Sequence, residues 1–229
     1  MNKRQDLHVL GHVFKVILFF AIILCFFGLS LSCKKQATPT PTPSSSTSAT
    51  ETPKSDLTNL DPTSAKDEMR NNYNTARQKA ILWLGDAVPY STSAKITPTL
   101  DWQDVIEVYT YGSKVQAAYW WTISISVRSK NYVRAIIPKE DYLGSNLQPI
   151  MLQYWKLNYI EAFQIAEKNG GKEWREKQKN NNYQITATLA MGDPKNYLYF
   201  TVDYQKSDGS DEKSVQINAF NGEIVEQEI

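Results

Sequence analysis

The sequence predicts an α+β protein with two tandem units, each a helix packed on an antiparallel β-meander, behind a signal or anchor segment and a disordered linker. Three observations predict this fold class. An apolar run and then a Thr/Pro/Ser tract come first, and two stretches with helical spacing of apolar residues are each followed by segments in which apolar and polar residues alternate. The expected boundaries are residues 1–32 for the signal segment, 33–61 for the tether, 62–150 for the first unit and 151–229 for the second.

The N-terminal segment has the parts of an export signal in their usual order. A basic start leads into an unbroken apolar run, Val16–Phe27, and small residues lie just before a lone cysteine, Cys33. This order is typical of a segment that is cleaved during export. It resembles a bacterial lipoprotein signal, with Ser30 at a position where that pattern prefers leucine. The resemblance implies that Cys33 carries the lipid.

An uncleaved membrane anchor is the alternative. The stretch from Val16 to Leu31 is sixteen residues long, between a typical signal core and a full bilayer span of about 20 residues. Under either interpretation the folded part lies outside the cytoplasm, in a bacterial cell envelope, and is held at a membrane. The tether has almost nothing apolar to bury, and proline recurs at alternate positions from Pro39 to Pro43. We therefore expect an extended, solvated spacer.

The composition limits the chemistry of a chain that begins at Cys33. Both histidines, His8 and His12, precede this cysteine, and the other cysteine, Cys25, lies inside the apolar run. Such a chain has no Cys/His metal site, no histidine base for a nucleophile and no internal disulfide. Its net charge is −1, because three basic and one acidic residue leave the 25 and 24 of the full chain, and this gives no electrostatic case for nucleic acid. We expect no enzyme, no cofactor and no metal.

The first unit is expected to begin with a helix over residues 65–85, capped by Thr63 or Ser64. Its apolar residues lean to one side at helical spacing: Met69, Tyr73, Ala76, Ala80, Leu82, Trp83 and Leu84. Strands are expected around Trp102–Tyr111, Val115–Arg128 and Tyr132–Ile137. In the middle segment Ile123, Ile125 and Val127 alternate with polar residues, which predicts one buried and one polar face.

The second unit is expected to begin with a helix from Asn158 to about Gln178. Asn158 and Glu161 have the spacing of a capping box, and the pair Gly170-Gly171 predicts a break or kink. The expected strands are Tyr183–Met191, Tyr197–Gln205 and Ser214–Phe220. Turns are expected at Asp208-Gly209 and at Asn221-Gly222, and the second turn leads into a short segment, Glu223–Val225.

The second unit also resembles a known family. Its last strand ends in a small residue followed by Asn-Gly-Glu-Ile, and the residues that form this pattern are Ile217, Ala219, Asn221, Gly222, Glu223 and Ile224. The strand Tyr197–Tyr204 and the helix around Tyr159–Ala166 precede it. Over about residues 158–226 this order resembles a PepSY domain, whereas the first unit has Val133–Glu140 at the equivalent place, without Asn-Gly-Glu-Ile. The resemblance implies an exported or membrane-attached bacterial protein that binds or inhibits a peptidase.

Aromatic residues are the candidates for a binding surface. The chain has six tryptophans and 13 tyrosines, and flat aromatic faces stack on sugar rings and anchor protein interfaces. Strand alternation predicts that Trp120, Tyr197, Tyr199 and Phe220 are exposed. The alternative for these residues is the core, if two sheets pack on the same faces.

Two functions from different classes fit these observations. The first is a surface-tethered, non-catalytic binding or regulatory lipoprotein that contacts or inhibits an extracytoplasmic peptidase by its sheet edge or its aromatic face. The second is a receptor for a cell-wall glycan or a small ligand, in which the two units form an aromatic cleft. The acidic turn with Asp208, Asp211 and Glu212 lacks the spacing of an EF-hand loop, so we expect a solvated hairpin there.

Overall fold

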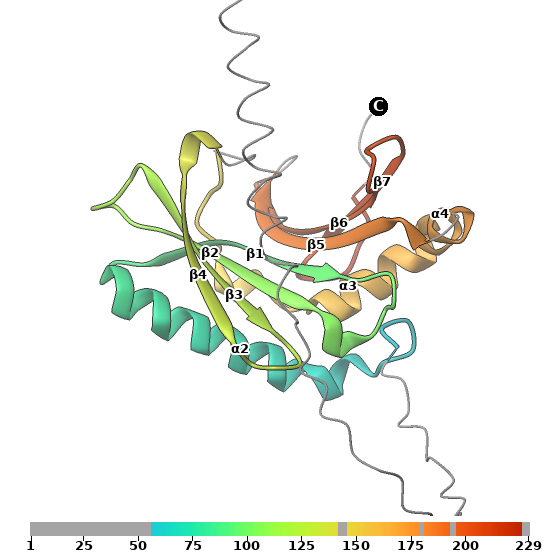
Figure 1. Ribbon diagram of the computed structural model, residues 1–229, viewed down its shortest axis with the longest axis horizontal. Helices are drawn as coiled ribbons and strands as arrows, with labels where there is room; N and C mark the ends of the chain where they lie inside the picture. Colours follow the sequence, from blue (N-terminus) through green and yellow to red (C-terminus); the bar gives the residue numbers. More distant parts are fainter. Residues whose placement is uncertain (1–55, 142–145, 179–180, 193–195, 226–229) are drawn as a thin grey trace, which may run out of the picture. The chain divides into compact units, whose positions relative to one another are not determined.

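The computed structural model describes residues 56–141, 146–178, 181–192 and 196–225. The predicted signal segment, the candidate lipidation site Cys33 and the tether up to residue 55 lie outside these ranges. The expectation that residues 56–61 belong to the disordered tether is wrong, because Leu57 is buried in the core and its N–H donates to the carbonyl of Leu100 at 2.9 Å. No helix within the described ranges is long and apolar enough to cross a membrane. The α+β class is confirmed, because helices pack on one antiparallel sheet of seven strands (Figure 1).

The sheet has the spatial order β4-β3-β2-β1-β5-β6-β7, and each neighbouring pair is antiparallel. In chain order the strands are β1 (Val88–Ile96), β2 (Ile106–Gly112), β3 (Tyr119–Ser126), β4 (Tyr132–Pro138), β5 (Tyr183–Gly192), β6 (Tyr197–Lys206) and β7 (Glu212–Asn218). β1 pairs with β5 from Ser91 opposite Ala190 to Ile96 opposite Ile185. The strands of the two expected meanders therefore form one continuous sheet.

Two long helical segments pack on this sheet. α2 (Pro62–Leu84) contacts β2 and β3, and α3 (Tyr159–Ala166) contacts β5, β6 and β7. The remaining helical elements are η1 (Trp102–Asp104), η2 (Lys139–Asp141), η3 (Leu152–Tyr154), η4 (Glu167–Gly171) and α4 (Lys172–Lys177). The core lies between the helices and the sheet: Ala76 and Ala80 of α2 pack with Tyr109 and Ile123, and Phe163 of α3 belongs to the larger cluster under the second half.

α2 begins earlier than the sequence indicated. Asp61 is the cap: its side chain accepts a 3.0 Å hydrogen bond from the N–H of Thr63, so the helix starts at Pro62, where the missing N–H costs nothing. The helix ends at Leu84 because Gly85 takes a φ of 74°. The predicted stop is confirmed, whereas the placement of Leu82 on the buried side is wrong, since its side chain is exposed.

The strands of the first half differ from expectation in three places. β1 was not expected at all, because Ser91, Thr92 and Ser93 give it little apolar character; it lies at the centre of the sheet, between β2 and β5. Residues 102–104 form a 3₁₀ turn instead of strand, since Asp101 accepts a 2.9 Å bond from the N–H of Gln103. Residues 115–118 form a turn as well, so β3 starts only at Tyr119.

The second half follows the prediction closely. The capping box is confirmed: the side chain of Asn158 accepts from the N–H groups of Ile160 and Glu161 at 2.9 Å, and Glu161 accepts from the N–H of Asn158 at 2.7 Å. The predicted kink is confirmed at Gly170, whose φ of 91° separates α3 from α4. β7 ends two residues early, because the side chain of Asn218 accepts a 2.9 Å bond from the N–H of Phe220 and turns the chain.

Candidate functional site

The four candidate surface residues divide into two pairs. Tyr197 and Phe220 are exposed, at 52% and 54% of their residue reference areas, whereas Trp120 and Tyr199 are only 1% and 3% exposed. The expectation that Trp120 and Tyr199 lie on the surface is therefore wrong. The alternation of apolar and polar residues predicts which face of the strand each residue occupies, but it does not predict whether other parts of the chain cover that face.

Aromatic and cationic neighbours bury Trp120. The ring of Tyr90 packs against it with 4.8 Å between centroids, and the ammonium of Lys139 lies 4.2 Å from its centre. Gly112, on the adjacent strand, leaves the space that the indole occupies, since an added Cβ would lie 3.1 Å from the ring. Tyr199 lies across the ladder from Ala190 on one side and Asn218 on the other, and its ring centroid is 6.4 Å from that of Tyr197.

Tyr197 and Phe220 line a common cavity of about 450 Å³, which we call the aromatic cavity. Its large apolar side chains are Met151, Tyr154, Tyr197 and Phe220, and each of them is between 44% and 54% exposed. Leu198 and three amides, Asn196, Asn218 and Asn221, complete the lining. The cavity thus joins the η3 segment, the start of β6 and the turn after β7, and none of its lining residues is charged.

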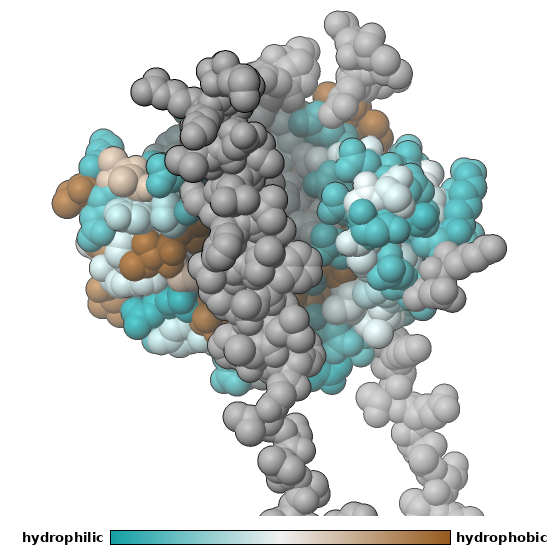
Figure 2. Space-filling model, turned by 45° about the horizontal axis from the view of Figure 1, so that its top comes forward, coloured by the Kyte–Doolittle hydropathy of each residue, from teal (hydrophilic) through white to brown (hydrophobic). Residues whose placement is uncertain are grey.

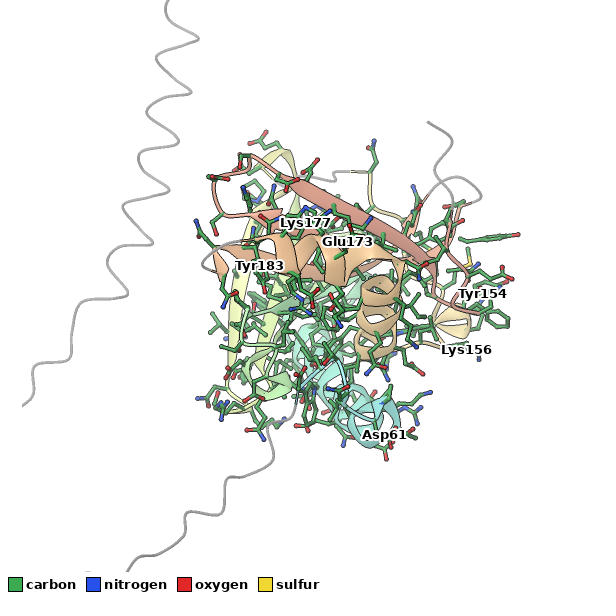
Figure 3. All side chains as sticks on the ribbon, turned by 90° about the vertical axis from the view of Figure 1, so that its right-hand side faces the viewer. Asp61, Tyr154, Lys156, Glu173, Lys177 and Tyr183 are labelled. Carbon is green, nitrogen blue, oxygen red and sulfur yellow. The ribbon has the colours of Figure 1, made fainter. Side chains whose placement is uncertain are left out.

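Backbone hydrogen bonds hold these three segments together. The N–H groups of Lys156 and Leu157 both donate to the carbonyl of Ala219, at 3.1 and 3.0 Å, and the N–H of Ala219 donates to the carbonyl of Leu198 at 2.9 Å. The rings of Tyr154 and Phe220 consequently meet edge to face, 6.4 Å apart. In Figure 3 the labelled Tyr154, which ends η3, and Lys156, two residues further along the chain, lie at the right of the view. The backbone therefore fixes the relative positions of the segments that line the aromatic cavity.

Two asparagine side chains of the aromatic cavity have their amide NH₂ groups left to donate hydrogen bonds to a ligand. Asn218 and Asn221 use their side-chain oxygens to accept from the N–H groups of Phe220 and Glu223, at 2.9 and 3.1 Å. These turns, with Gly222 at a φ of 80°, place Phe220 outside the sheet. The amide NH₂ group of each asparagine remains to donate to a ligand. The cavity thus offers hydrogen-bond donors beside apolar rings.

A sheet edge is the other expected contact, and β4 and β7 are the two edge strands. At the β4 edge, the N–H of Ser126 donates to the carbonyl of Asn131 and that of Lys139 to the carbonyl of Ala118, at 3.1 and 3.0 Å. Along an antiparallel pair, every second residue bonds to the partner strand, and the residues between them direct their N–H and C=O groups away from it. The backbone groups of Tyr132, Arg134 and Ile136 therefore point away from β3. Exposed apolar side chains gather at this end of the sheet, at the left of Figure 2. Pro138 then ends the strand without an N–H.

A buried carboxylate under α2 escaped the sequence analysis. Glu107 of β2 is 2% exposed, and its Oε2 accepts from the Nδ2 of Asn72 at 2.9 Å and from the hydroxyl of Tyr109 at 2.7 Å. Burial raises the pKa of Glu107 to about 7, although hydrogen bonds from Tyr109, Asn72 and Tyr159 act in the opposite direction. Asn72 belongs to α2 and Tyr159 to α3, so Glu107 links both helices to the sheet.

The alternation of residues along β2 could have predicted that this carboxylate is buried. Glu107 stands between Val105 and Tyr109 at two-residue spacing, and both of these neighbours are buried. A charged residue on the inward face of a strand is rare unless hydrogen bonds satisfy it. The group is enclosed between the helices and the sheet, and this burial favours its protonated form.

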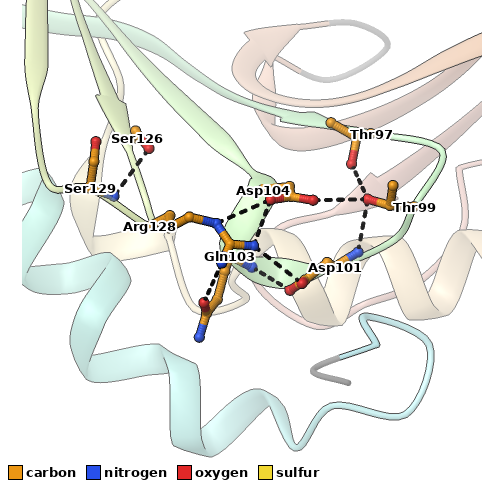
Figure 4. Close-up of polar contacts among 8 residues, drawn as sticks. All are labelled: Thr97, Thr99, Asp101, Gln103, Asp104, Ser126, Arg128 and Ser129. Carbon is orange, nitrogen blue, oxygen red and sulfur yellow. Dashed lines mark hydrogen bonds and ion pairs between the residues drawn. The ribbon is translucent and has the colours of Figure 1, made fainter. Parts of the chain in front are cut away.

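Two further polar clusters have structural roles. Glu167 is paired with Arg175 at 2.7 Å and accepts a 3.0 Å bond from the hydroxyl of Tyr204, which fixes the kink between α3 and α4. At the surface, Arg128 is held by Asp101 and Asp104 (Figure 4), a contact that solvent weakens. Within the described ranges no group of three or more His, Cys, Asp or Glu side chains is placed to hold a metal ion.

Comparison with protein-family models gives no match for this chain, and no curated protein or solved structure matches it.

Proposed function

We propose that the chain is an exported, non-catalytic lipoprotein, anchored at Cys33, whose folded part binds an extended segment of an extracytoplasmic protein at the aromatic cavity. The observation that carries this proposal is the set of four half-exposed apolar side chains around one uncharged cavity. Contiguous exposed apolar groups mark interaction sites on soluble proteins, and buried aromatic anchors dominate the energy of such contacts.

The size and lining of the aromatic cavity favour a peptide segment. Its volume of about 450 Å³ is within the usual range for ligand sites and fits one or two large apolar side chains. The amide NH₂ groups of Asn218 and Asn221 are suited to the backbone carbonyls of an extended chain. An apolar side chain of the partner would enter between Tyr154, Tyr197 and Phe220.

The resemblance to PepSY domains supports a peptidase as the partner. All the residues that line the aromatic cavity lie within 151–229, the unit that carries the resemblance. We also propose that the two halves are tandem versions of one unit. In support of this, α2 precedes the antiparallel strands β1–β4 as α3 precedes β5–β7, and the halves meet where β1 pairs with β5.

The tether would give the folded part freedom to reach its partner. Residues 33–55, as a flexible chain, would have a root-mean-square length of about 26 Å, and their prolines extend it further. The signal resemblance, the lone Cys33 and the Thr/Pro/Ser tract support attachment to a membrane in the bacterial cell envelope.

Crosslinking on living cells tests the proposal. We expect full-length protein to capture an envelope protein, and Phe220→Ala to reduce the captured amount at least about tenfold, since losing an aromatic anchor costs roughly 2 kcal/mol or more. The matched control is Val115→Ala, which also shortens an exposed apolar side chain but lies outside the aromatic cavity. Equal capture by the wild type and Phe220→Ala would contradict the proposed contact.

A receptor for a cell-wall glycan is the second candidate. The observation in its favour is that tyrosine rings and asparagine amides line the aromatic cavity together, the combination that stacks on and hydrogen-bonds sugars. Capture of no protein above background, together with a fluorescence change on adding soluble cell-wall fragments, would favour this receptor over the protein-binding module.

A further inference from the structure

A second hollow lies beside the aromatic cavity, between α2 and the segment that leads into α3. We call it the basic hollow. It has a volume of about 240 Å³, and its lining includes Lys66, Arg70 and Tyr73 from α2 and Trp155 and Lys156 from the other side. A space of this size holds one amino-acid side chain or a small organic acid.

The charges around the basic hollow are all of one sign. Lys66 and Arg70 are four residues apart on α2, so they lie one helical turn from each other, and Lys156 lies opposite. No acidic residue lines the hollow. Within the described part of the chain, none of these three cations forms an ion pair. Glu161, near the same segment, is engaged as the cap of α3.

The wall of the basic hollow also has an apolar part. Met69, Tyr73 and Trp155 contribute this surface, and the rings of Tyr73 and Trp155 pack edge to face at 5.2 Å. Apolar surface beside the cations suits a ligand that has both an apolar body and a negative charge.

We propose that the basic hollow binds a carboxylate carried on a small apolar body. The three cations attract the carboxylate, and the apolar wall receives the body. Arg70 offers a planar fork that matches a carboxylate, and Lys66 and Lys156 add point charges. Two sources share this chemistry: a free organic acid, and the acidic side chain or C-terminus of a peptide.

The η3 turn places the two hollows back to back. Met151 and Tyr154 line the aromatic cavity, while Leu152 and Trp155 line the basic hollow. A peptide that crosses this turn would put an apolar side chain in one and a carboxylate in the other. The proposal that the carboxylate belongs to a peptide rests on the proposed function, whereas the proposal that the hollow binds a free organic acid does not.

The first arm of the test uses a free acid. Full-length protein in detergent is titrated with 3-phenylpropanoate and with its neutral amide, 3-phenylpropanamide, and binding is followed by saturation-transfer NMR. We expect the amide to bind about tenfold more weakly, since it loses the charge-assisted hydrogen bonds. Arg70→Gln combined with Lys156→Gln should weaken binding of the acid by a similar factor. The matched control, Lys95→Gln, removes an exposed cation elsewhere and should leave it unchanged.

The same titration shows whether the acid binds in the basic hollow or in the aromatic cavity. Phe220→Ala is expected to leave binding of the acid unchanged, since Phe220 does not line the basic hollow. Equal binding of acid and amide, or binding that survives loss of Arg70 and Lys156, would overturn the proposal.

The second arm identifies the source. Hexapeptides are selected from a phage-displayed random library on the wild-type protein. Enrichment of sequences that pair an aromatic residue with Glu or Asp, lost in the Arg70/Lys156 double variant, supports the peptide source. Enrichment of aromatic sequences without an acidic preference would leave the proposed function standing and overturn the peptide source. Absence of any enrichment would count against the proposed function, and binding of the free acid in the first arm would then assign the basic hollow to small organic acids.

Discussion

Gly171→Ala is expected to lower the free energy of unfolding by about 3 kcal/mol, because the kink between α3 and α4 leaves no room for a methyl group. A Cβ at this position would lie against the hydroxyl and ring of Tyr204 and 2.9 Å from the carbonyl of Ala166. Tyr204 is fully buried and donates to Glu167, which in turn pairs with Arg175. The ring therefore moves only if it breaks this buried cluster.

Urea unfolding of the purified chain measures this loss. Gly192→Ala is the matched control, since a Cβ there would have its nearest neighbour, an atom of Tyr199, at an ordinary 3.7 Å. We expect the control to change the unfolding free energy by less than about 0.5 kcal/mol. Equal midpoints for Gly171→Ala and the wild type would show that the Tyr204–Glu167–Arg175 cluster yields easily and does not fix the kink.

Glu107→Gln is expected to stabilise the protein at pH 8 and to have little effect at pH 4.5. The folded chain raises the pKa of Glu107 from 4.5 to about 7, so between these values the folded state keeps a proton that the unfolded state releases. This stability is fully present below the ordinary pKa and is lost as pH rises through about 7. The loss amounts to roughly 3 kcal/mol at most.

The glutamine variant isolates this effect because it keeps the hydrogen bonds. Its side-chain oxygen still accepts from Asn72 and Tyr109, which donate to Oε2 of Glu107 at 2.9 and 2.7 Å. Unfolding midpoints at pH 4.5 and pH 8 give the difference between variant and wild type. Glu140→Gln, at an exposed carboxylate, is the control. A difference that does not grow with pH would mean that Glu107 ionises without cost inside the fold.

Local signals in the sequence predicted the elements that short-range chemistry determines. The capping box at Asn158, the kink at Gly170 and the alternation along β6 are confirmed because each depends on neighbours within a few residues. β1 was missed for the opposite reason. Its polar residues form a strand because β2 and β5 flank it on both sides, and pairing of that kind overrides local propensity.

The candidate site was predicted in part, for the same physical reason. Alternation shows which side of a strand a residue occupies, so Tyr197 was correctly expected to be exposed. Phe220 is exposed as expected, but because the turn after β7 places it outside the sheet. Trp120 is covered by Tyr90 and Lys139, which are distant in sequence. The aromatic cavity itself arises because the η3 segment is bonded to Ala219, a long-range contact that no local pattern encodes.

The continuous sheet also decides how the function is tested. Removing residues 158–229 would take β5 away from β1 and leave a central strand as an edge. Loss of binding in such a truncation would report misfolding as readily as a lost contact. Single replacements at exposed positions avoid this problem, since surface changes away from packed groups alter stability by less than about 0.5 kcal/mol.

Site-specific photocrosslinking on living cells is the most direct test of binding at the aromatic cavity. p-Benzoylphenylalanine replaces Tyr197 in the cavity or Tyr132 on the β4 edge, two tyrosines that are 52% and 42% exposed. The account predicts a covalent adduct with one envelope protein from position 197 and none from position 132. An adduct from position 132 alone would place the partner on the sheet edge, and no protein adduct from either position would contradict the protein-binding function.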